Sequence, residues 1–344
     1  MRKRAVIFLF TVLILCGCVA VISKMITPSV EEKVGQLFLV RCEHSMMESI
    51  LSKNPAGVVM FGVDFKDLTR EQIRDKTENY QKMSKTPLII AVDEEGGTVV
   101  RVSSNKNICS EKYKSPREYY LEGGMDLIVK NTAEKSQLLT GLGINMNLAP
   151  VADVSTDEND FIYDRALGEN AEATAEYVSA VVKAMNENGI ASCLKHFPGY
   201  GNNEDTHTGI AVDDRSYSLF EKSDFLPFIS GIRSGADAVL VSHNIVNCMD
   251  FELPASISPE VHKILREELG FNGLIMTDDM SMGAMKDYGT PYVKAVLAGN
   301  DLVMVSDFEV AYNEVLEAVR NGEIPQSIID TAYERIKKWK KESL

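Results

Sequence analysis

Cysteine is scarce in this chain, and no two cysteines are spaced as a metal-binding pair. Of six cysteines, the four that follow the N-terminal segment are scattered, at Cys42, Cys109, Cys193 and Cys248. Zinc ligands usually come in closely spaced pairs, so this pattern indicates no zinc site. A domain of this size can be stable without cross-links, and we therefore predict no structural disulfide.

Clusters of basic residues are also lacking. The sequence has 36 Lys and Arg against 50 Asp and Glu, a formal net charge of −14, and no basic stripe follows the first four residues. Proteins that bind nucleic acid need clustered Lys and Arg to contact phosphates. We therefore expect no nucleic-acid partner.

Repeats, low-complexity stretches and linkers are absent after about Pro28. The 344 residues are 45% hydrophobic and 25% charged, which is ordinary for a globular protein. We therefore predict one domain over residues 28–344. Its length suits a single α/β barrel, which typically needs about 250 residues.

Only one long hydrophobic run is present, and it lies in residues 1–27. Arg2, Lys3 and Arg4 precede an apolar stretch from Ala5 to Ile22, as in a signal peptide. Within this stretch, the run Leu15-Cys16-Gly17-Cys18 is similar to a bacterial lipoprotein cleavage box, in which Cys18 would carry the lipid. An uncleaved membrane anchor and ordinary secretion are the alternatives. All three place residues 28–344 outside the cytoplasm.

In the rest of the chain, short apolar runs alternate with amphipathic segments of helical length. The eight predicted strands are 57–61, 88–92, 144–149, 191–195, 238–241, a weak one at 254–257, 274–276 and 302–305. The predicted helices include 69–84, 124–142, 171–188, 219–234, 259–269, 308–321 and 325–341. Such alternation is typical of βα units around a parallel sheet. The pattern predicts an α/β fold, a (β/α)8 TIM-like barrel.

Unusual polar residues follow the ends of these predicted strands. They are Asp93, Asp153, Lys195, His196, Ser242, His243, Asp278 and Ser306. In barrels of this kind, the active site lies at the carboxyl ends of the strands. The spacing therefore predicts a catalytic barrel.

The most informative segment leaves the strand at 191–195. Lys195 and His196 begin the run Lys-His-Phe-Pro-Gly-Tyr-Gly, and Asp205, Thr206 and His207 follow it. Cations and titratable side chains at the end of a buried strand are costly unless they bind or react with something. A solvated polar loop is the less favoured alternative.

This segment resembles the signature of the β-N-acetylglucosaminidase branch of glycoside hydrolase family 3. Three further segments resemble that family's, in the family's order: 93–97 with Arg101, 147–153 with 164–168, and 277–282. Together the matches span roughly residues 30 to 310.

The resemblance implies Asp278 as the catalytic nucleophile. Asp279 follows it directly, and successive side chains leave a strand in opposite directions, so only one easily faces the barrel axis. The resemblance also implies an acid/base made of His207 and Asp205. Histidine titrates near neutrality, and a neighbouring carboxylate would orient its ring.

The resemblance further implies a sugar-binding set. Its members are Asp93, Arg101, Arg165, Lys195 and His196. For Arg101, a salt bridge that braces the loop is an equal alternative, and for His243 structural support and substrate contact both stay open. The chain departs from the family at Tyr200, where a second histidine is usual, and the run to His207 is one residue shorter. These departures leave the resting position of His207 open.

We expect an exo-acting, retaining β-N-acetylglucosaminidase that acts on peptidoglycan fragments or chitooligosaccharides through a covalent glycosyl-aspartate. We expect no metal or organic cofactor, and a monomer. A β-glucosidase or β-xylosidase of the same family is the closest alternative. Others are transfer to phosphate and a non-catalytic, lipid-anchored sugar-binding protein. A metal-dependent barrel hydrolase is disfavoured, because its usual His-x-His on an early strand is absent.

Overall fold

The computed structural model describes residues 28–201 and 211–344. Its eight main strands are all parallel, in the spatial order β10-β1-β2-β3-β4-β5-β7-β9. They are β1 (Phe38–Arg41), β2 (Gly57–Met60), β3 (Ile89–Val92), β4 (Met146–Asn147), β5 (Ala191–Phe197), β7 (Ala238–Val241), β9 (Leu274–Thr277) and β10 (Val303–Val305). A single bridge between Met276 and Leu302 joins the two ends of the sheet. The predicted barrel is therefore confirmed.

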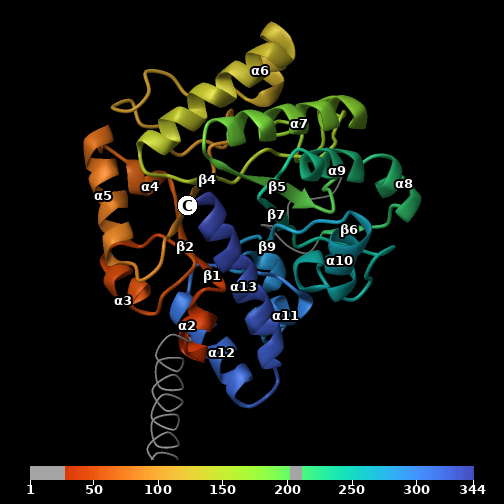
Figure 1. The fold of residues 1–344 in the computed structure, drawn as a ribbon. Helices are drawn as coiled ribbons and strands as arrows, with labels where there is room; N and C mark the ends of the chain where they lie inside the picture. The colour runs from red at the N-terminus through yellow and green to blue at the C-terminus, as the bar shows by residue number, and fades with distance from the viewer. Residues whose placement is uncertain (1–27, 202–210) are drawn as a thin grey trace, which may run out of the picture.

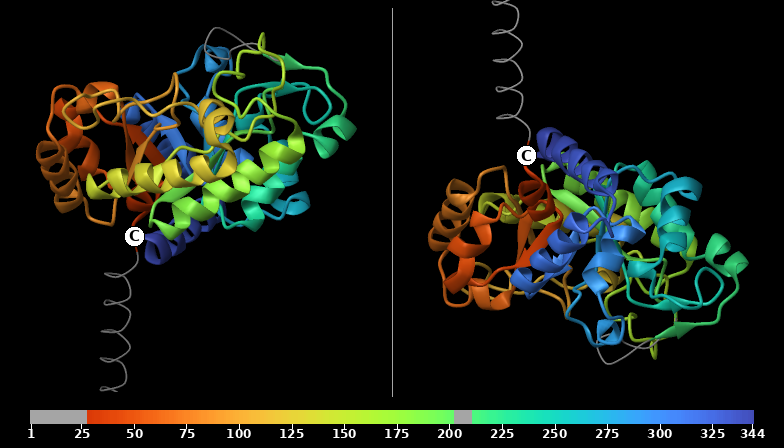
Figure 2. Two further views of the ribbon diagram at one scale, coloured as in Figure 1. Left: turned by 90° about the horizontal axis from the view of Figure 1, so that it is seen from above. Right: turned by 90° about the horizontal axis from the view of Figure 1, so that it is seen from below.

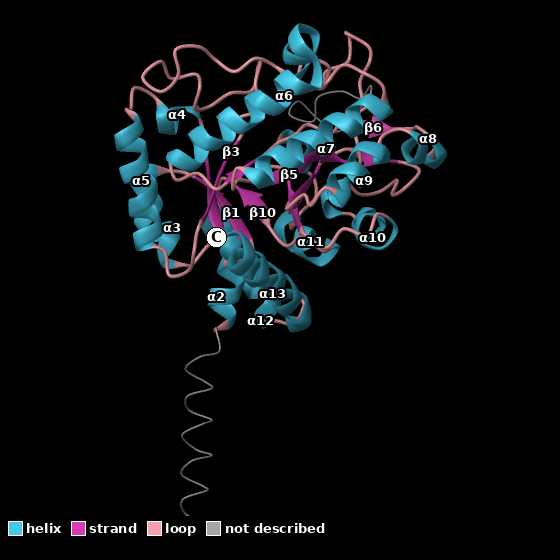
Figure 3. Ribbon diagram, turned by 45° about the horizontal axis from the view of Figure 1, so that its top comes forward, coloured by secondary structure: helices cyan, strands magenta, loops and turns pink. Residues whose placement is uncertain are grey.

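Helices surround this barrel (Figure 1), and the strands lie at its centre (Figure 3). The larger helices are α5 (Arg70–Met83), α6 (Pro116–Gly141), α7 (Ala171–Glu187), α9 (Phe225–Arg233), α11 (Pro291–Ala298), α12 (Phe308–Arg320) and α13 (Gln326–Ser343). Shorter helices are α2 (Val30–Gly35), α3 (Met47–Ser52), α4 (Gly62–Phe65), α8 (Tyr217–Lys222) and α10 (Pro259–Lys263). A short sheet of β6 (Val212–Asp213) and β8 (Ile245–Val246) lies beside the barrel.

Local sequence explains where several helices begin. The Ser115 hydroxyl accepts a hydrogen bond from the backbone N–H of Glu118, and the Glu118 carboxylate accepts one from the backbone N–H of Ser115. Pro116 follows at the first helical position of α6. The side chains of Asn170 and Asp307 each accept a hydrogen bond from a backbone N–H in the first turn of α7 and α12, respectively. Gly123 and Gly124 interrupt α6 with non-helical backbone. The predicted helix at 124–142 is the part of α6 after this break.

Two apolar layers hold the barrel together. One fills its interior with side chains such as Leu39, Val59 and Met276, and the other packs the strands against the helices. Because both faces of the strands are buried, β2, β3 and β9 carry no exposed residue. In the sequence these strands therefore appear as short continuous apolar runs.

Two predictions of strands were wrong. Residues 254–257 form a 3-10 turn, η2 (Ala255–Ile257), because Pro254 has no N–H to donate to a sheet ladder. The prediction also missed β1, whose four residues follow directly on the short helix α2. The errors cancel in the count, so Asp278 still follows the seventh barrel strand.

Two predicted helices are each divided in the structure. The segment 219–234 divides near Asp224 into α8 and α9, and 259–269 continues from α10 as a π-helical turn, η3 (Ile264–Glu268). Among the described residues, no helix combines the length and hydrophobicity that a membrane span requires.

Both ends of the described chain lie at the amino end of the barrel. α13 packs Ile336 and Trp339 into the interior layer, and the Trp339 indole donates to Asp237 Oδ1 just before β7, at 2.9 Å. Lys33 of α2 pairs with Asp330 of α13 at 2.7 Å. In both views of Figure 2 the C-terminus lies beside the red N-terminal elements. The carboxyl ends of the strands are thereby left open at the opposite face.

Candidate active site

A pocket of about 520 Å³ lies at the carboxyl ends of the strands. Its walls come from residues far apart in the sequence, which include Phe61, Asp93, Glu95, Arg101, Arg165, Lys195, His196, Tyr200, Asp278, Asp279, Met282 and Lys286. All five sugar-binding candidates and the candidate nucleophile therefore line one cavity. Its size is in the range of small-molecule sites.

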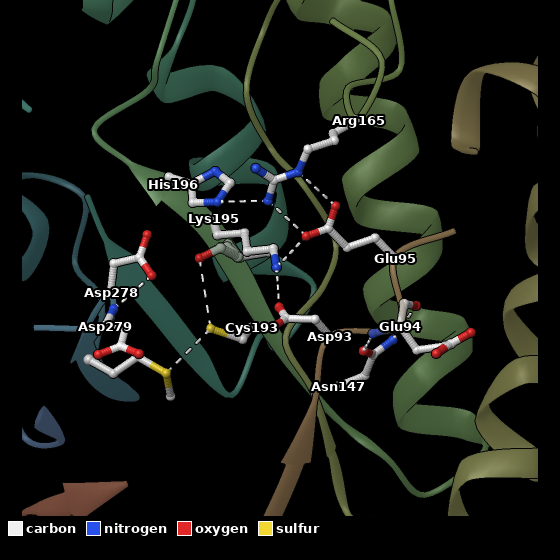
Figure 4. Close-up of polar contacts among 12 residues, drawn as sticks. Asp93, Glu94, Glu95, Asn147, Arg165, Cys193, Lys195, His196, Asp278 and Asp279 are labelled. Carbon is white, nitrogen blue, oxygen red and sulfur yellow. Dashed lines mark hydrogen bonds and ion pairs between the residues drawn. The ribbon is translucent and has the colours of Figure 1, made fainter. Parts of the chain in front are cut away.

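Lys195 lies at the centre of one wall, nearly fully buried, between two carboxylates (Figure 4). Its Nζ is 2.6 Å from Asp93 Oδ1 and 2.5 Å from Glu95 Oε1. Burial alone would lower the pKa of this amine, but the charges of Asp93 and Glu95 raise it above the ordinary lysine value. Lys195 is therefore a fixed cation.

Glu95 also binds Arg165 through two hydrogen bonds. Arg165 Nε donates to Oε2 at 3.0 Å, and its Nη2 donates to Oε1 at 2.8 Å. Burial would raise the pKa of this carboxyl, but Lys195 and Arg165 hold it well below its usual range. A buried anion shared by two cations fixes the positions of both side chains.

His196 connects this cluster to Asp153. Its Nδ1 lies 2.7 Å from Asp153 Oδ2, and Arg165 Nη2 lies 3.1 Å from its Nε2 (Figure 4). Because a carboxylate only accepts, the ring donates to Asp153 through Nδ1. Asp153 also accepts the backbone N–H of His196 and that of Tyr200.

Tyr200, which stands where the family usually has a histidine, is buried. Its ring meets the His196 imidazole edge-on, with the two centroids 5.1 Å apart. The departure from the family pattern thus leaves the position of His196 supported by an aromatic contact.

Asp278 follows β9 on the other side of the pocket, facing the Lys195 cluster (Figure 4). It is half-buried, and its Oδ1 accepts the backbone N–H of Asp279 at 2.8 Å. Burial would raise its pKa, but His243 and His196, with this hydrogen bond and Lys195, lower it below the ordinary aspartate value.

The neighbouring Asp279 is occupied by hydrogen bonds from its own loop and from the next strand. Its carboxylate accepts from the Ser281 backbone N–H at 2.9 Å and from Ser306 Oγ at 3.1 Å. It lines the pocket as well. Both carboxylate oxygens of Asp279 thus accept hydrogen bonds from described residues, whereas Asp278 uses only one of its two. The second oxygen of Asp278 can contact a ligand.

Arg101 lines the pocket, and the alternative of a salt bridge that braces its loop is not seen among the described residues. No ion pair joins it to any residue in 28–201 or 211–344, and its buried Nε has no hydrogen-bond partner there. Its loop is held instead by Glu94, whose carboxylate accepts the backbone N–H groups of Arg101 and Val102, each at 2.7 Å. The guanidinium lies 5.9 Å from the centroid of the Phe61 ring, another residue of the pocket wall.

His243 is fully buried below the pocket. Its Nδ1 is 2.7 Å from Ser256 Oγ, and its Nε2 is 3.1 Å from the backbone oxygen of Asp279. Of the two alternatives, these contacts favour structural support of the loop that carries Asp278.

The loop after β5 is held at both of its described ends. Arg215 binds Asp213 and Asp224 through its guanidinium and donates to Gly199 O at 3.2 Å. A side chain at Gly201 would collide with Arg215, since a Cβ there would lie 2.4 Å from its Cζ. Asp205 and His207, the candidate acid/base pair, lie outside the described residues.

Sequence reasoning assigned no role to three carboxylates that the structure places at or beside the site. Glu95 joins Lys195 to Arg165, Asp153 holds His196, and Glu94 orders the turn at Arg101. Glu94 and Glu95 stand beside Asp93, and Asp153 follows a predicted strand, so composition marked the segments. The partners of Glu95 and Asp153 come from other segments of the barrel, so the sequence alone could not identify them.

Comparisons with known proteins agree on the family. Residues 29–339 match the model described as "Glycosyl hydrolase family 3 N terminal domain". A beta-hexosaminidase from Hydrogenovibrio crunogenus is 32% identical over 279 residues, which are 79% of this chain and 77% of that protein. A beta-hexosaminidase from Xylella fastidiosa strain M23 is 34% identical over 271 residues, 77% and 79% of the two proteins.

A solved structure shares the fold as well. The family 3 beta-N-acetylglucosaminidase from a Paenibacillus species superposes with a TM-score of 0.86 at 28% identity. The match covers 92% of this chain and 62% of that one. With the pocket at the carboxyl ends of its strands, the chain belongs to glycosyl hydrolase family 3 and is a glycoside hydrolase.

Proposed function

We propose that the chain is an exo-acting, retaining β-N-acetylglucosaminidase that releases terminal N-acetylglucosamine from peptidoglycan fragments or chitooligosaccharides. The observation that carries the proposal is the ionised, half-buried Asp278 facing the cluster of Asp93, Glu95, Lys195 and Arg165 across one cavity. The names of the curated relatives, beta-hexosaminidases, support the choice of sugar.

Asp278 is the proposed nucleophile. Retention needs a carboxylate that attacks the anomeric carbon and a second group that protonates the departing oxygen. The lowered pKa of Asp278 favours the ionised form that attack requires. Attack forms a glycosyl-aspartate bond as the glycosidic bond breaks, and water then releases the sugar.

The cluster opposite Asp278 is proposed to bind the sugar. Asp93 has a carboxylate oxygen beside Lys195 and can accept from sugar hydroxyls, while Arg165 and Lys195 can donate to hydroxyl or acetamido oxygens. Arg101 lines the pocket as well and makes no ion pair with another described residue, so its guanidinium can also donate to the sugar. Because every member is held by a buried partner or by its loop, the site needs little rearrangement to bind.

His207 and Asp205 are proposed as the acid/base pair. This assignment rests on the resemblance of the Asp-Thr-His run, since no described contact involves them. His207 would donate its proton to the leaving oxygen and later take one from the attacking water.

A comparison of two chromogenic substrates tests the substrate assignment. The purified enzyme should hydrolyse an aryl β-N-acetylglucosaminide far faster than the matching aryl β-glucoside. Equal turnover, or turnover of the glucoside alone, would favour the β-glucosidase alternative. No turnover with retained sugar binding would favour a non-catalytic protein, and a rate that depends on added phosphate would indicate phosphorolysis.

We also propose that the chain is carried outside the cytoplasm on the membrane, through a lipid on Cys18 or through an uncleaved apolar segment. The basic and apolar pattern of residues 1–27 supports this location. The intact mass of protein extracted from membranes distinguishes a lipidated Cys18, a full-length anchor and simple cleavage.

A further inference from the structure

A lysine of α6 is buried behind the pocket wall, outside the pocket itself. Lys135 lies on the buried face of this helix, and its Nζ donates to the backbone oxygen of Glu95 at 2.7 Å. The same Nζ lies 5.6 Å from the centroid of the Tyr113 ring. Its ammonium makes no ion pair with any other residue that the structure describes. A lysine in such a position is unusual, because lysine is almost never fully buried unless its charge is compensated.

The charge that compensates Lys135 comes from the acidic segment after β3. This segment carries three consecutive carboxylates, of which Asp93 and Glu95 pair with the cations of the pocket wall. Glu94 is fully buried and has no ion pair in the described chain. The charges of Glu94 and Glu95 both favour the charged form of Lys135. Lys135 therefore supplies, from behind the wall, a third positive charge for three carboxylates.

The backbone of this acidic segment is held by two other elements. Asn147 of β4 accepts the N–H of Glu94 at 2.9 Å and donates to the Glu94 oxygen at 3.1 Å (Figure 4). Lys135 of α6 binds the next carbonyl, that of Glu95. The position of a side chain follows from that of its backbone. These contacts therefore fix where the Glu95 carboxylate meets its two cations.

We propose that Lys135 is a positioning residue for the sugar-binding wall, because it holds the Glu95 backbone and balances the charge of the acidic segment. The inference rests on the proposed function, in which the cations held by Glu95, Lys195 and Arg165, bind the sugar. Without the ammonium, Glu95 would lose one of its supports, and Glu94 would stay buried without a counter-charge. The sugar should then bind more weakly, although Lys135 does not line the pocket.

Sugar binding should accordingly depend on pH in a range where the charge of Lys135 is lost. Burial lowers the pKa of this amine to about 8, although Glu94 and Glu95 oppose the effect. Between pH 7 and pH 9 most of the molecules therefore lose this charge. A lysine that only filled space in the core would not make sugar binding change in this range.

The other titratable groups around Lys135 keep their charge in this range. Burial raises the pKa of Tyr113, Tyr119 and Tyr177 above the ordinary tyrosine value. Lys114, which lines the same narrow cavity as Lys135, has its pKa raised by a hydrogen bond to Glu122. The two neighbouring carboxylates, described above, belong to the acidic segment.

The test measures the dissociation constant of N-acetylglucosamine at pH 7 and pH 9, from the acetamido methyl signal of the sugar in an NMR titration. The proteins compared are the wild type, Lys135→Met, Lys135→Arg and Lys130→Met. Lys130 is an exposed lysine of the same helix, so Lys130→Met is the matched control. Comparing the ratio of the two constants between proteins removes the contribution of groups that titrate elsewhere in the pocket.

The wild-type dissociation constant should be about five- to tenfold higher at pH 9 than at pH 7, since a hydrogen bond from a charged donor is worth about tenfold or more in an equilibrium constant. Lys135→Met should bind weakly at both pH values, with a ratio close to one. Lys135→Arg stays charged at pH 9, so its ratio should also be close to one. Its affinity should exceed that of Lys135→Met, and Lys130→Met should match the wild type.

A wild-type dissociation constant that is the same at pH 7 and pH 9 would overturn the inference, and this result needs no variant that folds. Equal ratios in the wild type and in Lys135→Met would overturn it as well. In both cases the sugar still binds, so the proposed function stands. If N-acetylglucosamine bound at neither pH, the proposed function would fail, and the inference with it.

Discussion

Asp278 illustrates how neighbouring groups decide the protonation state of a carboxyl. Burial disfavours its charged form, but two imidazoles, a backbone N–H and the Lys195 cation outweigh that penalty and lower its pKa. A nucleophile must be ionised before it can attack. The acid limb of kcat/KM that belongs to Asp278 should therefore lie below the ordinary aspartate pKa of about 3.9.

Replacing Asp278 with Ala should almost abolish hydrolysis. Loss of a nucleophile in a comparable covalent mechanism lowers kcat by about 10⁴-fold or more. Steady-state rates with an aryl β-N-acetylglucosaminide give the measurement, and the mass of enzyme trapped with a fluoro-sugar identifies the labelled residue. Retention of more than a few per cent of the activity would exclude Asp278 as the nucleophile.

His207→Ala should slow the reaction according to the leaving group. Good leaving groups depart with little protonation, so their rates should fall least, whereas alkyl glycosides should lose far more. A series of aryl glycosides of graded phenol acidity makes the comparison. Equal losses across the series would count against His207 as the proton donor.

Arg215 shows how one side chain ties several elements together. It joins β6 through Asp213 to the start of α9 through Asp224 and to the end of β5 through Gly199. Burial raises the pKa of Asp224 to about 6, and Arg215 opposes this rise. Both carboxylates are almost fully buried, so the ion cluster is sensitive to the loss of its cation.

Arg215→Met should destabilise the fold by about 3–5 kcal/mol, because Asp224 stays buried without its cation. Urea unfolding at neutral pH gives the measurement. The matched control is Arg320→Met, which removes an exposed pair with Glu31 (2.7 Å) and should cost below about 1 kcal/mol. Similar losses for the two variants would contradict a special role for the buried cluster.

Helix α13 carries a buried lysine at the amino end of the barrel. Lys340 Nζ donates to Gln36 Oε1 at 2.9 Å, and burial lowers its pKa to about 7. In the unfolded chain this amine has a pKa of about 10.4. Between these values the unfolded chain binds a proton that the folded one has lost, so stability rises with pH.

The free energy of unfolding should therefore rise by about 2 kcal/mol from pH 7 to pH 9 through this one group. Lys340→Met should remove that rise. Lys338→Met, which changes an exposed lysine two residues earlier on α13, should retain it. Urea midpoints at the two pH values measure the difference. A slope that is unchanged in Lys340→Met would show that Lys340 does not titrate in this range.

At the scale of the whole molecule, the start of the described chain and the pocket lie at opposite ends of the barrel. The described chain begins at α2 beside α13, at the amino end of the barrel (Figure 2). The pocket lies at the carboxyl ends of the strands. A membrane attachment through residues 1–27 would leave the pocket facing away from the bilayer. Soluble fragments could then reach it without hindrance.

Membrane-bound and released enzyme should therefore have the same KM for a soluble chromogenic substrate, within about twofold. The comparison uses full-length protein in native membranes and the chain 28–344. A much higher KM for the bound form would mean that the membrane obstructs the pocket.

The sequence by itself determined the class of fold and the segments that carry chemistry. Apolar runs and helical periods are local properties, so the barrel, the Lys195 segment and the order of the motifs could be predicted. The prediction of individual strands was wrong where the local sequence pattern was weak. The four-residue strand β1 was missed, and Pro254 turned an expected strand into a 3-10 turn.

Only the tertiary structure decided which charges meet. Glu95 reaches Lys195 and Arg165 because β3, β5 and the segment before α7 bring their ends together, and Asp153 reaches His196 in the same way. Pairing depends on distances across the barrel, and the spacing of residues along the chain does not encode these distances.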